Sequence, residues 1–241
     1  MSLNTTYCSR AAAHCQMSDY LQPLIAGMAA EADPGQAAQM ARYMRDQFPY
    51  YGIKSPLRRE ILRGFLKEYG SPAVTNLPEL AQALWELPQR EHQYNALDIL
   101  IRLQKKLQPD FLPTLHWLIT TKSWWDTVDA LASNVSGTLF ANFPEEGATA
   151  VQQWRSVENI WLRRTTLLHQ LKYKDKTNAP LLFSLIEENL DDDEFFIQKA
   201  IGWALREYSK TDETAVRDFV AATDLSPLAH REALKWLNNK Q

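Results

Sequence analysis

Apolar residues recur along most of the chain at the three- and four-residue spacing of amphipathic α-helices, and no stretch shows the sustained alternation of a β-strand. Proline, aspartate, asparagine and serine interrupt this pattern, and several prolines stand at or near helix starts, where a missing N–H group costs nothing. The predicted helices cover residues 18–31, 34–48, 56–69, 77–86, 89–106, 109–120, 124–140, 145–155, 158–173, 178–190, 194–209, 212–223 and 226–238. Short helices without long linkers favour packing as antiparallel pairs rather than as a bundle of long helices.

Three segments resemble one another at a spacing typical of helical repeats. The first, HQYNALDILIRLQKK, begins at His92; the second, WLRRTTLLHQLKYKDK, begins at Trp161; the third, FIQKAIGWALREYSK, begins at Phe196, 35 residues after the second. Aligning the last two places Arg164 opposite Lys199. We therefore predict an all-α fold, an α-solenoid (superhelix) of HEAT-like helical repeats whose second helices line a concave surface suited to a long ligand.

The first residues of the chain differ from the rest. Residues 1–17 lack both a strong helical pattern and the long apolar run of a signal peptide, so we expect a loose tail followed by a single domain over residues 18–241. The two cysteines, Cys8 and Cys15, provide neither a disulfide framework nor a metal-ligand spacing. No apolar run is long enough for a membrane span, and a cytoplasmic location is the expectation.

Charge is segregated along a chain whose formal net charge is −3, a total that does not by itself indicate nucleic-acid binding. Residues 42–67 carry seven cations against two anions, residues 151–176 carry six cations against two anions, and residues 187–194 carry six anions. Ordinary solvated helix faces can produce this pattern. It also fits a cationic inner face that follows a phosphate backbone while the acidic loop is turned outward.

Residues 121–130, TKSWWDTVDA, place two tryptophans and two aspartates within about a turn and a half of helix. Ser123 and Asp126 have the spacing of a capping box at a helix N-terminus. Trp124 lies in phase with an apolar stripe, and we expect it in the core.

Trp125 and Asp129 remain, one turn apart on a face that is neither apolar nor plainly solvated. A structural interpretation bonds the aspartate to an indole N–H or to a neighbouring arginine. A functional interpretation places a π face beside an anion, an arrangement that holds a cation or a developing positive charge.

Other positions combine charge with an apolar or aromatic setting. Trp203 and Arg206 share a helix face, as a core tryptophan with an extended arginine or as part of a binding surface, and Gly202 beside them suggests a close approach by a helix or a ligand. Arg164 stands among apolar residues and either pairs with a buried acid or points into a groove. Tyr43 is flanked by arginines, which suits a phosphate contact.

Common enzymatic signatures are missing from the sequence. It contains no glycine-rich phosphate loop, no GxSxG motif and no HExxH motif. We accordingly expect neither a metal nor a nucleotide cofactor.

Five blocks of the sequence match a known family in their residues, their order and their spacing: MARYMRDQFPYYGIKSPLRRE, WELPQREHQYNALDIL, TKSWWDTVD, NIWLRRTTLLHQLKYK and EFFIQKAIGWALREYSKT. On these blocks the sequence resembles the AlkD family of bacterial DNA alkylation repair glycosylases, from about residue 20 to the C-terminus.

The resemblance implies a superhelix of HEAT-like repeats whose concave face binds duplex DNA. It implies an enzyme that excises N3- and N7-alkylated purines, of the 3-methyladenine and 7-methylguanine type, by cleaving the N-glycosidic bond during base-excision repair. Trp125, Asp129 and Trp203 match the family's cleft motif. Tyr43, Arg164 and Arg206 match positions that contact DNA in the family.

In this hypothesis Asp129, the only carboxylate of the set, stabilises an oxocarbenium-like charge on the deoxyribose and orients water. The two tryptophans contact the sugar and backbone through their π faces. The expected partner is double-stranded DNA that contains alkylated purines. The protein is expected to act as a monomer and not to associate with a membrane. The alternatives are a non-catalytic HEAT-repeat protein that binds distorted or branched DNA, and a protein-binding HEAT scaffold.

Overall fold

All the secondary structure described is helical. The computed structural model describes the backbone of residues 4–239 and the side chains of residues 17–239, and within these ranges it contains no β-strand. The predicted all-α class is confirmed, and the succession of short helices is consistent with an α-solenoid. The chain divides into two compact units, Met1–Leu103 and Gln104–Gln241, and the predicted single domain spans both of them.

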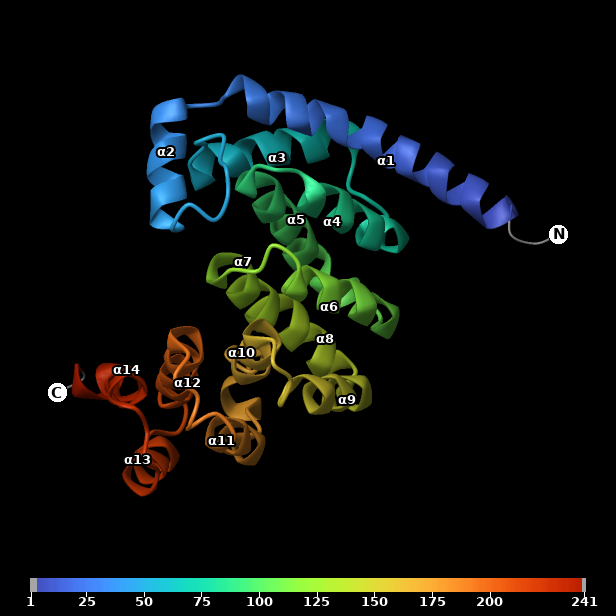
Figure 1. Cartoon of the computed structure of the whole chain (residues 1–241). Helices are drawn as coiled ribbons and strands as arrows, with labels where there is room; N and C mark the ends of the chain where they lie inside the picture. The colour runs from blue at the N-terminus through green and yellow to red at the C-terminus, as the bar shows by residue number, and fades with distance from the viewer. Residues whose placement is uncertain (1–3, 240–241) are drawn as a thin grey trace. The chain divides into compact units, whose positions relative to one another are not determined.

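In the first unit, helices pack against other helices that are close to them in the sequence. Helix α1 packs against α3 and α4, and α5 packs against α3 and α4 (Figure 1). The helices are α1 (Asn4–Ala30), α2 (Pro34–Tyr43), α3 (Ser55–Tyr69), the 3₁₀ helix η1 (Val74–Asn76), α4 (Leu77–Glu86) and α5 (Arg90–Leu103).

Helix α1 begins earlier than predicted. The backbone of residues 4–17 is helical, although this stretch was expected to be a loose tail, and residues 1–3 lie outside the described residues. Three successive alanines at positions 11–13 are strong helix formers even without an apolar stripe. Met17, the last residue of the expected tail, is buried.

A buried carboxylate fixes the chain between α2 and α3. Glu91 on α5 accepts hydrogen bonds from the backbone N–H groups of Tyr51, Gly52 and Ile53 at 3.1, 2.9 and 3.1 Å. Gly52 has a φ of +90°, and a Cβ at this position would lie 2.1 Å from the carbonyl oxygen of Asp33. The close approach of this loop to the start of α2 therefore requires glycine.

In the second unit α10 packs against several other helices, namely α6, α7, α9, α11 and α12, and α12 packs closely on α14 (Figure 1). The helices are the 3₁₀ helices η2 (Gln104–Lys106) and η3 (Pro109–Phe111), α6 (Leu112–Thr120), α7 (Trp125–Ala130), the π-helix η4 (Leu131–Ser136), α8 (Gly137–Asn142), α9 (Pro144–Trp154), α10 (Ile160–Leu168), the 3₁₀ helix η5 (Lys174–Lys176), α11 (Ala179–Glu187), α12 (Phe195–Tyr208), α13 (Glu213–Ala222) and α14 (Pro227–Asn238). None of the described helices is both long enough and apolar enough to cross a membrane.

Candidate active site

A cavity of about 260 Å³ in the second unit brings together five of the six site residues predicted from the sequence. Helices α7, α10, α12 and α14 contribute side chains to it. Its lining consists of Trp125, Asp129, Arg164, Phe195, Phe196, Lys199, Trp203, Arg206 and Glu232.

Trp125 and Asp129 lie one turn apart on α7, and both line the cavity, as their shared helix face predicts. The start of this helix differs from the prediction. The Ser123 hydroxyl donates to the carbonyl of Ile119 at 2.6 Å, and α7 has no side-chain cap. The capping box predicted for Ser123 and Asp126 is wrong, because Ser123 satisfies a carbonyl group at the end of the preceding helix.

Trp124 belongs to an aromatic cluster next to the cavity. Its ring centroid lies 5.8 Å from that of Trp161 and 5.0 Å from that of Phe196, which itself lines the cavity. Trp124 is half-buried, whereas the sequence placed it in the core. The cluster supports one wall of the cavity through Phe196.

The helix widens immediately after the aspartate. The continuous helix predicted over residues 124–140 is instead α7, the π-helix η4 and α8. The Ser133 hydroxyl donates to the carbonyl of Asp129 at 2.7 Å, and the Asn134 amide donates to the carbonyl of Ala130 at 2.9 Å. Side chains thus bond carbonyl groups where the helix changes pitch, and π-turns are frequent at functional sites.

Asp129 and Arg164 form a bidentate ion pair. Arg164 donates from Nε to Oδ1 at 2.7 Å and from Nη2 to Oδ2 at 2.9 Å, and its Nη1 donates to the carbonyl of Phe196. Burial raises the pKa of Asp129 above its ordinary value, while the hydrogen bonds and charge of Arg164 act in the opposite direction. Of the possibilities left open by the sequence, the structure shows an aspartate bonded to an arginine and an arginine paired with a shielded acid.

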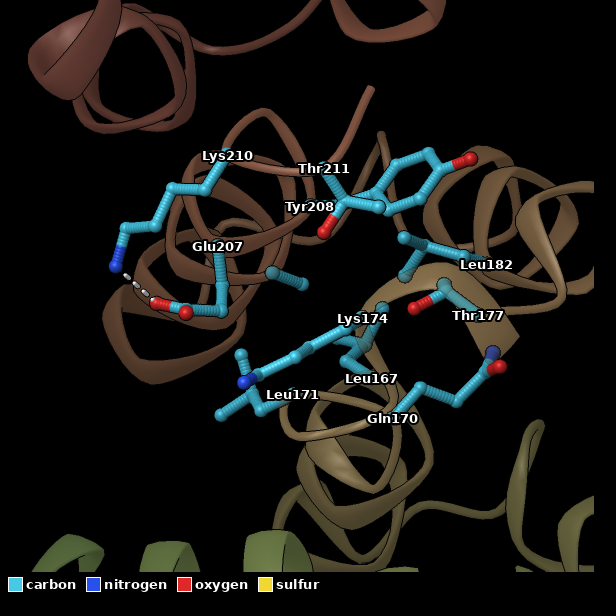
Figure 2. A pocket seen from close by; sticks show the side chains of 11 residues that line it. Leu167, Gln170, Leu171, Lys174, Thr177, Leu182, Glu207, Tyr208, Lys210 and Thr211 are labelled. Carbon is cyan, nitrogen blue, oxygen red and sulfur yellow. Dashed lines mark hydrogen bonds and ion pairs between the residues drawn. The ribbon is translucent and has the colours of Figure 1, made fainter. Parts of the chain in front are cut away.

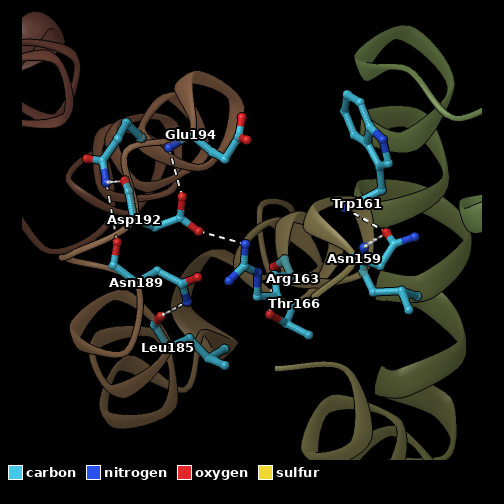
Figure 3. A network of polar contacts seen from close by, with 10 residues as sticks. Asn159, Trp161, Arg163, Thr166, Leu185, Asn189, Asp192 and Glu194 are labelled. Atoms are coloured by element: carbon cyan, nitrogen blue, oxygen red, sulfur yellow. Dashed lines mark hydrogen bonds and ion pairs between the residues drawn. The ribbon is translucent and has the colours of Figure 1, made fainter. Parts of the chain in front are cut away.

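Two successive arginines of α10 reach different carboxylates. Asn159 caps this helix by accepting from the N–H groups of Trp161 and Leu162 at 3.0 and 3.2 Å (Figure 3). Arg163 then pairs with Asp192 at 2.7 Å, while Arg164 pairs with Asp129. Successive helical side chains are about 100° apart, so the neighbouring arginines serve different sides of α10.

The Asp192 pair also changes the predicted charge pattern. Asp192 and Glu188 come from the acidic stretch 187–194, and they pair with Arg163 and Arg155 of the cationic stretch. Of the two interpretations of the charge pattern, the one with the acidic loop turned outward does not hold for Asp192 and Glu188, because both contact cations of the other stretch. Local attraction between the two stretches removes much of the cationic excess expected there.

Helix α12 presents Lys199, Trp203 and Arg206 to the cavity, and Glu232 on α14 joins its two cations. The Glu232 carboxylate lies 3.0 Å from Lys199 Nζ and 2.6 Å from Arg206 Nη1. Asp129 is thus not the only carboxylate of the site, contrary to the sequence-based expectation. A Cβ on Gly202 would lie 2.5 Å from Glu232 Cβ, so the close approach predicted at this glycine is that of a helix, α14.

Four lining residues were not among the predicted site residues: Phe195, Phe196, Lys199 and Glu232. Lys199 is four residues before Trp203, so helical phase offered a signal for it. Glu232 had no local signal, because its contact with α12 joins residues far apart in sequence. Phe195 stands out in the structure because it is 51% exposed at the cavity.

Tyr43, the sixth predicted site residue, lies in the first unit at the end of α2 and is 72% exposed. The helix predicted over residues 34–48 ends here, because Arg45 and Asp46 have left-handed φ values of 55° and 56°. A contact between Tyr43 and DNA stays a prediction.

A second cavity in this unit, about 300 Å³ in volume, contains none of the predicted site residues. It is lined by residues from the end of α10 and the turns that follow it, from α11 and from the C-terminal part of α12, including the apolar Leu167 and Leu182 (Figure 2). Glu207 and Lys210 pair with each other at its edge, at 2.6 Å. Among residues 17–239, no group of three or more histidine, cysteine, aspartate or glutamate side chains is placed to hold a metal ion.

These features define a protein whose described residues form only helices and place two shielded carboxylates, two tryptophans and three cations around one cavity. A model of the DNA alkylation repair enzyme family matches residues 24–237, and the chain belongs to this family. A solved structure described as a predicted DNA alkylation repair enzyme from Enterococcus faecalis is 36% identical, with a TM-score of 0.79 over 86% of this chain and 96% of that chain. No curated protein sequence matches the chain. The family predicted from the sequence blocks is confirmed, and it supports a role in DNA repair.

Proposed function

We propose that this protein is a DNA glycosylase that excises cationic N3- and N7-alkylated purines from duplex DNA by hydrolysis of the N-glycosidic bond, in base-excision repair of alkylation damage. The observation that carries the proposal is the presence of Asp129, Trp125 and Trp203 in the lining of one cavity, with Arg164 holding the Asp129 carboxylate. Family membership supports DNA as the partner.

The substrate determines what the site must supply. An N3- or N7-alkylated purine carries a positive charge, so its glycosidic bond is already weakened. When that bond breaks, its electron pair neutralises the departing purine, and positive charge develops on the deoxyribose. Water then bonds to C1′ and loses a proton. The enzyme therefore needs an anion near the sugar and a positioned water more than it needs an acid.

Asp129 can meet both needs. A carboxylate offers about four acceptor positions, and Arg164 occupies two of them. The positions that remain are available to a water molecule and to the developing charge. The bidentate contact fixes the carboxylate, so little reorganisation is required during the reaction.

Trp125 and Trp203 line the cavity with Asp129, and their indole faces suit contact with a deoxyribose that becomes cationic. Arg206 and Lys199 offer partners for the phosphates next to that sugar. Because these groups act on the sugar and backbone, the alkylated base does not have to be enclosed, unlike the base in most base-flipping enzymes.

One observation favours a second candidate, a non-catalytic HEAT-repeat protein that binds distorted or branched DNA. The charge of Asp129 is matched by Arg164, so the pair can serve to join α7 to α10 without any chemistry. Such a protein would bind DNA without releasing a base.

Release of 7-methylguanine from methylated duplex DNA, under single-turnover conditions, distinguishes the two candidates. We expect the wild-type protein to release the base and Asp129→Asn to release it at least about a hundredfold more slowly, because the developing cation loses its anion. Release by the variant at a near wild-type rate would remove Asp129 from the chemistry. No release by the wild type would favour the binding protein.

Asp192→Asn provides a matched control. Asp192 also pairs with an arginine of α10, and its side chain is 13% exposed, compared with 15% for Asp129 (Figure 3). Both variants lose one carboxylate charge beside α10 and the ion pair that it makes, and the melting temperature of each variant is measured to verify that it folds. We expect the control to retain base release, which separates the chemistry of Asp129 from its contribution to stability.

A further inference from the structure

Glu232 lies where two cavity cations converge. Lys199 and Arg206 are seven residues apart on α12, which places them on one helix face with Trp203 between them. One oxygen of the Glu232 carboxylate accepts from Lys199 and the other from Arg206. The two cations are therefore close enough to bind a single anion together.

The packing of α14 on α12 makes this contact possible. Gly202 precedes Trp203, and a Cβ there would lie 2.5 Å from the Glu232 Cβ and 2.9 Å from the carbonyl oxygen of Ala229. Because Gly202 has no Cβ, α14 can pack close to α12. This short distance between the helices places the Glu232 carboxylate between the two cations. The side chain of Glu232 is 12% exposed, so its position is determined by packing as well as by charge.

The two cations differ from Arg164 in what they can still bind. Arg164 is 5% exposed, and all three of its guanidinium nitrogens donate within the protein. The side chains of Lys199 and Arg206 are 36% and 25% exposed, and each contacts Glu232 through one nitrogen. An ammonium has three N–H donors and a guanidinium has five, so both can bind a second anion while Glu232 holds them.

We propose that Glu232 is a positioning residue that holds Lys199 and Arg206 on either side of Trp203, so that their remaining donors bind one phosphate group of the damaged strand. This inference rests on the proposed function, because it assumes that the damaged nucleotide lies against the same cavity. It assigns a role to Lys199 and Glu232, and it transfers phosphate binding from Arg164, which is engaged with Asp129, to the α12 pair.

The sign of the effect distinguishes positioning from simple charge repulsion. Removing an anion from a protein that binds a polyanion strengthens binding if only overall charge matters. If Glu232 positions the two cations, Glu232→Gln weakens binding instead, because both long side chains regain freedom that they must lose on contact with phosphate. We expect the dissociation constant to rise about two- to fivefold, the range of one partly exposed ionic contact.

Binding is measured on a duplex with a 2′-fluoro-7-methylguanine nucleotide, whose glycosidic bond resists cleavage, so the result does not depend on catalysis. Single phosphates around the lesion are replaced in turn by neutral methylphosphonates. The wild type should lose affinity at one linkage, and Glu232→Gln should lose nothing further there, because residues acting on one contact are not additive. The double variant Lys199→Met/Arg206→Met should likewise be insensitive to Glu232→Gln.

Glu207→Gln is the control, since it removes an equal charge from α12 and also breaks a lysine contact, at the edge of the other cavity (Figure 2). Its affinity should equal or exceed that of the wild type. Wild-type or tighter binding by Glu232→Gln overturns the role of Glu232. So does a loss of affinity in Glu232→Gln that adds to the loss caused by the methylphosphonate. Absence of base release by the wild type defeats the proposed function alone, because the binding comparison still stands. The methylphosphonate series on the wild type remains informative even if a variant fails to fold.

Discussion

Asp129 is subject to opposing influences that the cavity keeps in balance. Burial disfavours the charged carboxylate, and the Arg164 guanidinium favours it, with burial the larger effect. A carboxyl held this way protonates more readily than an exposed one, because its pKa is raised. The residue is thus an anion that its surroundings stabilise incompletely, which suits a group that must attract a transient cation.

The pKa of Asp129 leads to a prediction for the pH dependence of base release. We expect the single-turnover rate to fall as the pH is lowered through a pKa above the ordinary 3.8, because protonation removes the charge that stabilises the deoxyribose cation. The titration of Asp129 does not lower the rate by unfolding the protein. A raised carboxyl pKa in the folded state means that its contribution to the free energy of unfolding increases as the pH falls through that value.

The measurement is a pH–rate profile for release of 7-methylguanine, with circular dichroism at each pH to verify folding. Any residual activity of Asp129→Asn should lack this acid limb. An unchanged limb in the variant would show that another group titrates.

Single residues were predicted from the sequence where helical phase was sufficient. Trp125 and Asp129 share a face at a spacing of four residues, and Trp203 and Arg206 do so at three, so one helix each was enough to group them. Glu232 could not be predicted in this way. Its role depends on the distance between α12 and α14, which Gly202 sets through the atom that it lacks.

Helices α12 and α14 are held together by a contact that only glycine permits. Alanine is a better helix former than glycine by about 1 kcal/mol at an exposed interior position. At Gly202 the added methyl group would meet Glu232 Cβ at 2.5 Å and the Ala229 carbonyl oxygen at 2.9 Å, distances that force the helices apart. Overpacking of this kind costs about 1–3 kcal/mol, which exceeds the gain in helix propensity.

We therefore predict that Gly202→Ala lowers the free energy of unfolding by up to about 2 kcal/mol. Gly64→Ala is the matched substitution, since Gly64 lies inside α3 and a Cβ there would meet nothing within 4 Å. It should raise the free energy of unfolding by up to about 1 kcal/mol. Urea unfolding of both variants tests the pair, and stabilisation by both substitutions would contradict the packing of α14 on α12.

At the scale of helices the sequence predicted most elements and missed particular ends. The helix predicted over residues 158–173 ends at Leu168 in the structure, and the one predicted over 178–190 ends at Glu187. Both predictions ran too long because the apolar pattern continues into the turns that follow the helices. The π-helix at Leu131–Ser136 was hidden for a similar reason. Apolar spacing alone does not distinguish π-turns from α-turns, and the side chains that bond the carbonyls there, Ser133 and Asn134, are common in both.

The charge of the whole molecule helps to distinguish a DNA-binding protein from a protein-binding scaffold. Formal net charge is −3, and several cations are paired inside the folded units. These pairs include Arg58 with Asp98, Arg155 with Glu188, Arg163 with Asp192, and Arg164 with Asp129. DNA binding must then depend on a limited set of accessible cations rather than on a general attraction. Such binding is expected to be weak at high salt and sensitive to the loss of single residues.

The salt dependence of duplex binding tests this at the scale of the whole molecule. Each phosphate neutralised on B-form DNA contributes about −0.9 to the slope of log K against log salt concentration. We expect a clearly negative slope for the wild type and a slope smaller in magnitude by about one unit for Arg206→Met, because this variant loses one phosphate contact. Arg217→Met, which removes a cation that pairs with Glu213 on α13, should leave the slope unchanged. A wild-type slope near zero would favour the protein-binding scaffold, since that function requires no phosphate contacts. A negative slope that neither variant alters would keep DNA as the partner but place its backbone away from α12.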